Sequence, residues 1–305
     1  MKILLVGFGS LGLRHLQSIA QLGYFVDVLD PSVQNIDENS QQIENIFHNK
    51  IKYHNEPLSI GSHYDICIIS TSSKPRLRVI EDLQQRASWN FLILEKFLFP
   101  NINEYKIFEE IYKYNLDQVY VNCPRRYYPD YQNIKNSNPV EDFIGMNVQG
   151  SNWGMSTNGI HFLDLYSYLS SDKLNSFEPT SLKTIKSKRE GYGELIGNIS
   201  FFSSDSYLKL SSDETKALES FTIEILFKNK TYIVDEINNS CRIISNQSNN
   251  NTEVFTPIFQ SNLTHLYIND IIRIGYTNLP KYLQSRYDHL IFLDSLKDIK
   301  DLQIT

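Results

Sequence analysis

The chain has 305 residues, 41% of them hydrophobic and 21% charged, with a formal net charge of −6. This length favours two domains over one core, and the composition is typical of a soluble globular protein. No cluster of Lys and Arg resembles a nucleic-acid-binding stripe, and no apolar run approaches the roughly 18 residues of a membrane span. The three cysteines form no CxxC motif, so neither a zinc site nor a disulfide framework is predicted. We therefore expect a cytoplasmic protein with no nucleic-acid, membrane or metal partner.

The first residues carry the strongest signal. A strand-length apolar run over 2–6 leads into Gly7-Phe8-Gly9-Ser10-Leu11-Gly12, then a helical pattern to residue 20 and an apolar segment over 24–29 that ends in Asp30. Strand, Gly-x-Gly-x-x-Gly, helix, strand and acid form the fingerprint of a dinucleotide-binding βαβ unit. Gly7 allows the tight turn, Gly9 lets backbone approach a pyrophosphate, and Gly12 permits close helix packing. The free amides at the helix start then face the phosphate charge.

This segment has two other interpretations. An ordinary glycine-rich turn explains the glycines but not the whole unit. A signal peptide is excluded because glycines interrupt the apolar stretch and no small-residue cleavage pattern follows. Asp30 would accept hydrogen bonds from ribose hydroxyls and repel a 2′-phosphate, so NAD is favoured over NADP. Ser32 could still bind a phosphate, and no arginine follows closely.

Strands and helices alternate through residue 121, which predicts a doubly wound parallel sheet in an α/β domain over residues 1–121. The expected strands after Asp30 are 51–54, 64–70, 90–94 and 118–122, and the expected helices are 41–47, 74–87 and 103–114. In such a sheet, ligands bind beyond the carboxyl ends of the strands. The residues expected on that rim are Gly7, Asp30, Ser70, Thr71, Ser72, Glu95, Lys96 and Asn122.

The second part, residues 122–305, changes character. Segments of β type recur between residues 141 and 254 and are joined by polar turns, which predicts a mostly antiparallel sheet and an α+β domain. The expected strands are 143–148, 182–188, 195–202, 207–210, 221–227, 231–235 and 242–244. The expected helices are 127–135, 158–170, 263–274 and 279–299, and residues 245–252 are expected to form an exposed loop. No internal repeat is present.

Lys96 is the first candidate for chemistry. It follows a strand on the predicted cofactor rim, where a lysine can take the proton of a substrate hydroxyl. Burial and a cationic nicotinamide would lower the pKa of its amine toward neutrality. The competing interpretation is a surface lysine paired with Glu95, since most lysines are solvated.

His161 is the second candidate. It lies three residues before Asp164 on a predicted helix, so the two share a face and Asp164 could orient the imidazole. A histidine on a helix is more often a structural hydrogen-bonding residue, and that interpretation is given to the remaining histidines. These are His15, His48, His54, His63 and His265.

Together these features resemble the Gfo/Idh/MocA family, the relatives of glucose–fructose oxidoreductase and inositol dehydrogenase, over nearly the whole chain. The family's Glu-Lys-Pro motif is matched by Glu95-Lys96, with Phe97 where proline is usual. The resemblance implies that Lys96 is the catalytic lysine. The family's Asp-x-x-x-His signature aligns with Thr157 and His161, so the histidine is kept and the aspartate is lost. The segment 279–289 resembles the family's closing helix.

A closer resemblance is to members from bacterial surface-sugar clusters, including those for sialic-acid-like sugars. Asn122-Cys123-Pro124-Arg125-Arg126-Tyr127 and Ser151-Asn152-Trp153-Gly154 carry it. Arg125 or Arg126 could meet a carboxylate or phosphate; the alternative for both is a surface ion pair.

The resulting prediction is an NAD(P)-dependent oxidoreductase that acts on a hydroxyl or keto carbon of a sugar-like substrate. Lys96 would carry the proton with help from His161. The substrate would meet Asn122, Arg126, Trp153, Asn158 and His161, and the cofactor would meet Gly7, Gly9, Ser10, Leu11, Gly12, Asp30, Ser70, Thr71, Ser72, Glu95 and Lys96. The alternative is a non-catalytic NAD-binding sensor or scaffold, which the loss of the aspartate at Thr157 favours.

The resemblance also implies a homo-oligomer, because family members often pair through the open face of the second sheet. The segment 221–227 begins with apolar–polar alternation and could contribute to such a face. The alternative is that helices of the same chain cover both faces.

Overall fold

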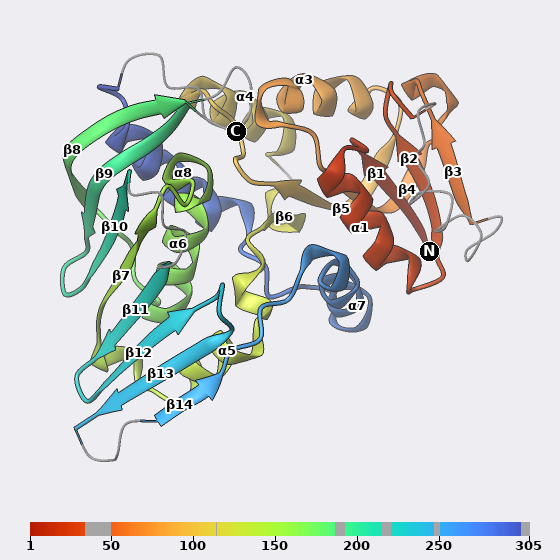
Figure 1. Ribbon diagram of the computed structural model, residues 1–305. Coiled ribbons are helices and arrows are strands. Elements are labelled where there is room, and N and C mark those ends of the chain that lie inside the picture. The colour runs from red at the N-terminus through yellow and green to blue at the C-terminus, as the bar shows by residue number, and fades with distance from the viewer. Residues whose placement is uncertain (34–49, 114, 187–192, 215–220, 247–250, 300–305) are drawn as a thin grey trace. The chain divides into compact units, whose positions relative to one another are not determined.

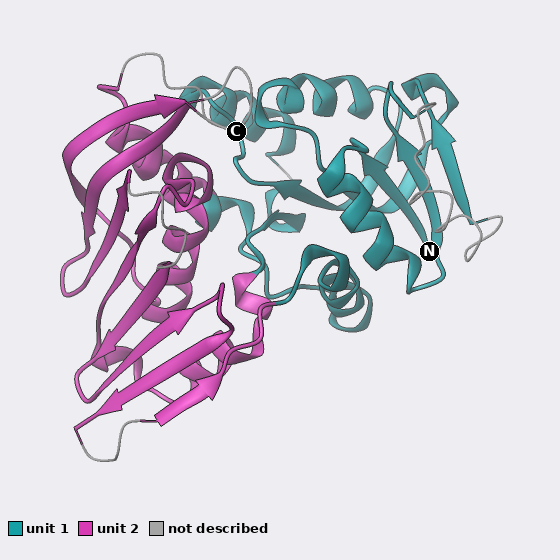
Figure 2. Cartoon of the chain, viewed as in Figure 1, with its two compact units in different colours: residues 1–124, 258–285 teal, residues 125–257, 286–305 magenta. Residues whose placement is uncertain are grey.

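The computed structural model describes residues 1–33, 50–113, 115–186, 193–214, 221–246 and 251–299. The chain divides into two compact units (Figure 2). Residues 1–124 and 258–285 form unit 1, and residues 125–257 and 286–305 form unit 2. The chain thus leaves unit 1 at residue 125, returns to it at residue 258 and ends in unit 2.

Unit 1 is built on a six-stranded parallel sheet in the order β3-β2-β1-β4-β5-β6 (Figure 1). Its strands are β1 (Lys2–Val6), β2 (Phe25–Leu29), β3 (Ile51–His54), β4 (His63–Ile69), β5 (Ser88–Glu95) and β6 (Val119–Asn122). The chain order reverses at β1, which pairs with β2 on one side and β4 on the other. This is the switch point at which doubly wound sheets bind ligands.

The central strands β1 and β4 are apolar over their carboxyl-terminal parts, because helices cover parallel sheets on both faces. Ile3, Leu4 and Leu5 of β1 and Ile68 and Ile69 of β4 are fully buried. The helices of unit 1 are α1 (Ser10–Ala20), α3 (Ser73–Gln84), α4 (Ile102–Tyr112) and α7 (Thr264–Ile274), with short 3₁₀ turns η1 (Pro57–Ser59), η2 (Leu116–Gln118) and η5 (Gln260–Asn262). A capping box formed by Asn101 and Glu104 fixes the start of α4.

Unit 2 holds an eight-stranded sheet in the order β14-β13-β12-β11-β7-β10-β9-β8. The strands are β7 (Phe143–Ser151), β8 (Ser176–Lys186), β9 (Gly193–Phe202), β10 (Tyr207–Asp213), β11 (Thr222–Phe227), β12 (Lys230–Asp235), β13 (Ser240–Ser245) and β14 (Asn251–Val254). Every pair is antiparallel except β7 with β10. The sheet is therefore mostly antiparallel, as the sequence predicted.

Helix α6 (Met155–Ser170) lies on this sheet, and Gly159 sets its distance. A Cβ at Gly159 would come within 3.2 Å of Leu210 in β10 and 2.7 Å of the Phe292 ring. Glycine therefore lets α6 pack closely against both neighbours. The remaining elements are α5 (Pro129–Asn136), η3 (Pro124–Tyr127), η4 (Val140–Asp142) and α8 (Tyr282–Ser295).

The structure differs from the sequence analysis at the edge of the second sheet and in the division of the chain. Residues 251 and 252, the end of the loop expected over 245–252, belong to the edge strand β14. The helix expected over 41–47 lies outside the described residues. Residues 258–285, assigned to the second domain, belong to unit 1. They do so because α7 packs on α1, where the Ser18 hydroxyl accepts the His265 amide at 2.9 Å; local sequence patterns do not reveal such distant partners.

Candidate functional site

Two of the three motif glycines are required by the packing of the protein itself. Gly7 has φ of +90°, and a Cβ there would lie 2.9 Å from the amide nitrogen of Thr71. A Cβ on Gly12 would lie 2.1 Å from the carbonyl oxygen of Gly7. Any larger residue at either position must displace backbone.

Gly9 is different, because nothing in the protein requires a glycine there. Its φ of −74° suits any residue, and no heavy atom lies within 4 Å of the position of a Cβ. α1 begins at the next residue and has no side-chain cap, so the amides of Ser10, Leu11 and Gly12 stand at an open helix start. A ligand phosphate fits this space, and a side chain on Gly9 would fill it.

Asp30 lies beside this loop, at the end of β2. Its Oδ2 accepts the amide of Phe8 at 2.7 Å, and its Oδ1 accepts the amide of Ser32 at 2.7 Å. The carboxylate therefore shapes the glycine loop as well as facing the rim. Each oxygen keeps capacity for a further donor such as a hydroxyl.

A small pocket of about 130 Å³ adjoins the loop and Asp30. Its lining residues are Val6, Gly7, Leu29, Asp30, Pro31, Asn55, Pro57, Thr71, Val79, Asp82 and Leu83. Thr71 Oγ1 is buried and has no hydrogen-bond partner among the residues that the structure describes. Ser70, its neighbour, instead donates its hydroxyl to the carbonyl of Gly7 at 2.6 Å, so it holds the loop. Ser72 precedes α3 and is exposed.

Glu95 is the centre of a buried polar cluster in unit 1. Its Oε1 lies 2.9 Å from Nε2 of His15 and accepts the side-chain amide of Asn122. His15 Nδ1 lies 2.9 Å from the Thr264 hydroxyl, and Asn122 also donates to Oε1 of Gln260 at 3.0 Å. Glu95 is therefore held by this cluster, and the structural interpretation of His15 is confirmed.

Lys96 follows directly at the carboxyl end of β5 and is half-buried. The Lys96–Phe97 peptide bond is cis, and Phe97 is fully buried. Asn122, opposite Glu95 in the sheet register, has a buried Oδ1 with no partner among the described residues. An acceptor without a partner among the described residues therefore lies on the strand next to β5, which ends just before Lys96.

In unit 2, Arg126 and Asp164 bind each other. Arg126 Nη2 donates to Asp164 Oδ1 at 2.6 Å and Nε donates to Oδ2 at 2.9 Å, and both side chains are buried. Burial raises the pKa of Asp164, and Arg126 opposes that shift. The sequence analysis predicted that Asp164 could orient the imidazole of His161 and that Arg126 would contact the substrate. The structure instead shows Asp164 paired with Arg126, and the buried guanidinium and carboxylate neutralise each other.

Arg125, the preceding arginine in the sequence, also forms an ion pair within unit 2. Its Nε and Nη2 donate to the two carboxylate oxygens of Glu236 at 2.9 and 2.7 Å. Its guanidinium lies 4.4 Å from the centre of the Phe162 ring. The ion-pair alternative therefore holds for both arginines, although neither pair is at the surface.

Trp153 and Asn158 build the turn that leads into α6. The indole nitrogen of Trp153 donates to the carbonyl of Ser211 at 2.8 Å, and its ring contacts Phe162 and Phe221. Asn158 Nδ2 donates to the carbonyl of Trp153 at 3.0 Å. Both residues are half-buried, as is His161 one turn further along the helix. Their polar contacts show a structural role that the sequence analysis did not anticipate.

Glu194 of β9 is the residue that sequence reasoning missed. Its Oε1 accepts the amide of Ser156 at 2.6 Å, and its Oε2 lies 3.3 Å from the hydroxyl of Thr157. The carboxylate thus caps α6 from another element. It also stands beside Thr157, where the family pattern has an aspartate. No local signal identifies it, since 37 residues separate Glu194 from Thr157.

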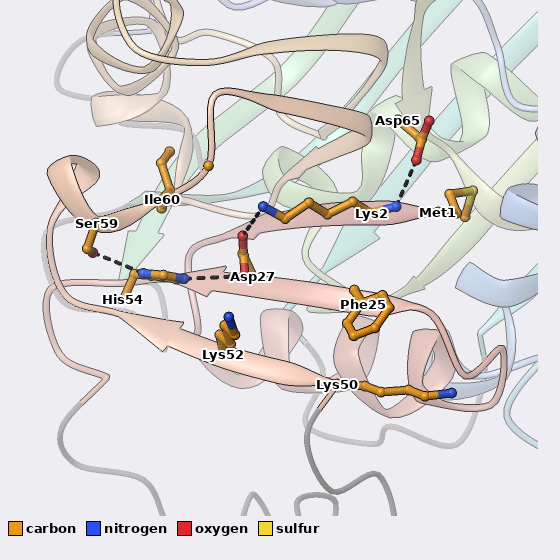
Figure 3. A pocket seen from close by; sticks show the side chains of 11 residues that line it. Met1, Lys2, Phe25, Asp27, Lys50, Lys52, His54, Ser59, Ile60 and Asp65 are labelled. Atoms are coloured by element: carbon orange, nitrogen blue, oxygen red, sulfur yellow. Dashed lines mark hydrogen bonds and ion pairs between the residues drawn. The ribbon is translucent and has the colours of Figure 1, made fainter.

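A second pocket, of about 480 Å³, is lined by residues of β1, β2 and β3 in unit 1 (Figure 3). Asp27 lies in it, bonded to the hydroxyl of Tyr64 at 2.6 Å and paired with Lys2 at 3.0 Å and with His54 at 3.3 Å. Burial raises the pKa of Asp27, but the bonds from Tyr64 and Lys2 outweigh it and leave the pKa lowered. The carboxylate is satisfied by its neighbours, so this network stabilises the sheet.

No protein-family model matches the sequence, and no curated protein matches it. Solved structures do share its fold. A UDP-N-acetylglucosamine 3-dehydrogenase, GnnA, from Acidithiobacillus ferrooxidans aligns with a TM-score of 0.70 at 12% identity, covering 97% of this chain and 96% of its own. An oxidoreductase from Agrobacterium radiobacter, solved with NAD⁺, L-tartaric acid and magnesium, aligns with a TM-score of 0.73 at 12% identity, covering 98% and 96%. A dehydrogenase (MviM) from Clostridium difficile aligns at 0.70 and 15%, covering 98% and 99%.

These likenesses establish the fold. A parallel Rossmann-type sheet accompanied by a mostly antiparallel sheet with helices is the architecture that the Gfo/Idh/MocA resemblance implied, and that prediction is confirmed. Within the described ranges, no helix is long and apolar enough to cross a membrane. The same residues hold no group of three or more His, Cys, Asp or Glu side chains arranged for a metal ion.

Proposed function

We propose that the chain is an oxidoreductase of the Gfo/Idh/MocA type that uses NAD and acts on a hydroxyl or keto carbon of a sugar-like substrate. Gly9 carries the cofactor part of this proposal. Neither the backbone nor the packing requires glycine there, while the amides of α1 beside it lack a cap. A dinucleotide pyrophosphate explains both observations. When bound, the nicotinamide supplies a two-electron acceptor or donor for the substrate carbon.

Other groups on the rim fit the same cofactor. Asp30 would accept the adenosine ribose hydroxyls and disfavour a 2′-phosphate, which favours NAD over NADP. The unpartnered Thr71 hydroxyl in the adjoining pocket offers a further contact. Fluorescence titration with NADH and NADPH tests this step; NADH should bind more tightly, and the absence of binding would contradict the proposal.

Lys96 is proposed as the group that exchanges the substrate hydroxyl proton. Its place at the end of β5 suits this role, and the carboxylate of Glu95 beside it is held by His15 and Asn122. A neutral amine at Lys96 would accept the hydroxyl proton as the carbon is oxidised and return it in reduction. The free Oδ1 of Asn122 would accept a hydrogen bond from the cofactor amide or a substrate hydroxyl.

Substrate recognition is proposed for unit 2. His161 would assist the proton exchange, with Asn158 and Trp153 supporting the first turns of its helix. The Glu194 carboxylate at Thr157 provides an acidic group where the family aspartate is lost, which favours the enzyme over a non-catalytic NAD-binding protein. GnnA acts on a nucleotide sugar by name, and a role in surface-polysaccharide or sialic-acid-like sugar synthesis follows from the same resemblance.

A substrate screen separates the enzyme from the sensor or scaffold. Nucleotide sugars and nonulosonate-type sugars would be incubated with NAD, and reduced nicotinamide would be read by absorbance. Turnover that depends on Lys96 supports the enzyme. Tight NADH binding without turnover on any of these sugars would favour the non-catalytic alternative and give Thr157 as its reason.

A further inference from the structure

One buried guanidinium, that of Arg76, holds the peptide segment that carries Lys96. Arg76 lies near the start of α3 and is 1% exposed. Its guanidinium nitrogens donate to the backbone on both sides of the lysine and to the loop after β4. The carbonyl oxygens that it reaches are those of Thr71, Glu95, Phe97 and Leu98, with Nη1 2.6 Å from that of Glu95 and 2.8 Å from that of Leu98. Two segments of the predicted cofactor rim therefore converge on one side chain.

Carbonyl dipoles surround this charge, and no carboxylate contacts it. Among the described residues, no Asp or Glu lies within ion-pair distance of Arg76, and its buried Nε has no hydrogen-bond partner. Burial lowers the pKa of Arg76 to about 10, and the charge of Glu95 opposes this shift. The guanidinium therefore remains positive at neutral pH.

Such an arrangement costs stability, because a buried charge without a counter-ion is poorly solvated. A neutral amide side chain could donate to some of the same carbonyls without that cost. The guanidinium contacts the backbone carbonyls of Glu95 and Leu98, on either side of Lys96. A like charge near an amine favours its neutral form, and this effect offers a reason to keep the charge. A lysine that accepts a proton near neutral pH needs that form.

We propose that Arg76 is a positioning residue for Lys96, fixing the backbone on both sides of the lysine while its buried charge favours the neutral amine. This inference rests on the proton-exchange role proposed for Lys96. It extends that role to a residue of another element that does not touch the substrate.

The test measures the pKa of Lys96 directly, in the full chain without cofactor or substrate. The rate of acylation by trace acetic anhydride would be followed against pH, and mass spectrometry would quantify the peptide that contains Lys96. Arg76→Gln keeps donors and removes the charge, so the pKa of Lys96 should rise by roughly one unit. Arg76→Lys keeps the charge, so the pKa should stay within about 0.3 units of wild type. Lys106, exposed on α4, serves as the control lysine and should not change.

An unchanged pKa of Lys96 in a folded Arg76→Gln variant would overturn the proposal. If Arg76→Gln does not fold, Arg76→Lys decides, because a rise of a full unit in that variant would show that charge is not the cause. NADH titration of the wild type is read separately. Failure to bind NADH would remove the proposed function, whereas the acylation result would still decide the link between Arg76 and Lys96.

Discussion

The starts of α1 and α6 both follow a glycine, extended at Gly9 and left-handed at Gly154, but their chemistry is opposite. Both helices begin just after a glycine, Gly9 for α1 and Gly154 for α6, and neither has a cap from its own N-cap side chain. At α1 the amides stand open. At α6 the carboxylate of Glu194 already accepts the amide of Ser156. A helix start is an anion site only where the protein has not supplied its own anion.

The comparison assigns different ligands to the two units. The open start of α1 suits a pyrophosphate, whereas an anionic group at the start of α6 would meet the charge of Glu194. Substrate groups near Thr157 should therefore be hydroxyls or other donors. Substitutions at both helix starts and at the cofactor rim test this difference.

Removal of the Lys96 amine should have the largest effect, and that effect is on turnover. Lys96→Met should lower turnover by roughly 10²–10⁴-fold, the usual contribution of a positioned acid or base. Binding of NADH should stay within a few-fold of wild type, because the glycine loop is untouched. Initial rates on a sugar that the wild type oxidises provide the measurement, and Lys106→Met is the matched control. His161→Ala should cost less, since water can partly replace an assisting imidazole.

Closing the open helix start should abolish tight cofactor binding without loss of fold. Gly9→Val should weaken NADH binding by roughly 100-fold, because amide–phosphate bonds at about 1.5–3 kcal/mol each are lost. Its melting temperature should remain that of wild type. Gly12→Ala is the matched control and should lower stability by about 1–3 kcal/mol, because its Cβ meets the Gly7 carbonyl. A strongly destabilised Gly9→Val variant would contradict the proposal that Gly9 serves cofactor binding rather than folding.

Removal of the Glu194 carboxylate should leave the start of α6 without its cap, as at α1. Glu194→Ala should destabilise the protein by about 1–3 kcal/mol, because the buried amide of Ser156 loses its acceptor. Added acetate should raise the melting temperature of this variant but not of wild type, and Glu194→Gln should need no rescue. An acetate effect of equal size in wild type would show that Glu194 does not occupy the site.

The choice between the two dinucleotides should shift with Asp30. Asp30→Ala should narrow the preference for NADH over NADPH by about tenfold, equivalent to about 1.4 kcal/mol of removed repulsion. Both cofactors should also bind somewhat less well, since the amide of Phe8 loses its acceptor. Fluorescence titrations of wild type and Asp30→Ala with NADH and NADPH measure the ratio of the two affinities. A wild type that prefers NADPH would show that Ser32 and its neighbours outweigh the carboxylate.

The smallest effect should come from a change at Asp27, which lines the second pocket. Its pKa is lowered from the ordinary value of 3.8 in the folded chain. A lowered pKa gives stability that is present above the unfolded value and is lost as pH falls through the folded one. Melting temperature should therefore fall with acid below about pH 4 less steeply in Asp27→Asn than in wild type, while NADH binding at neutral pH should be the same in both.

Local patterns predicted most of the fold and one part of the site. The apolar runs of β1 and β4 and the glycine motif are contiguous in sequence, so their geometry follows from steric rules that act over a few residues. The roles of Arg126 and Asp164 were not accessible in this way, because 38 residues separate them. Glu194 and Arg76 show the same limit: each acts on backbone that only the folded chain brings near.

The oligomer remains a prediction. Ile223, Ile225 and Phe227 of β11 are buried, and the residues between them are half-buried. Light scattering at micromolar concentration measures the assembly, and a species of only about 35 kDa would count against the dimer.

Unit 1 is formed from two separate segments of the chain, 1–124 and 258–285, and this has a consequence for synthesis. All six strands of the parallel sheet have left the ribosome long before η5 and α7, which complete the polar cluster at its rim. Asn122 and its partner Gln260 are 138 residues apart, a delay of roughly 7–30 s at about 5–20 residues per second. During that interval the buried carboxylate of Glu95 lacks part of its final surroundings. The nascent chain should therefore gain its affinity for a nucleotide late, after residues 125–257 of unit 2 have emerged.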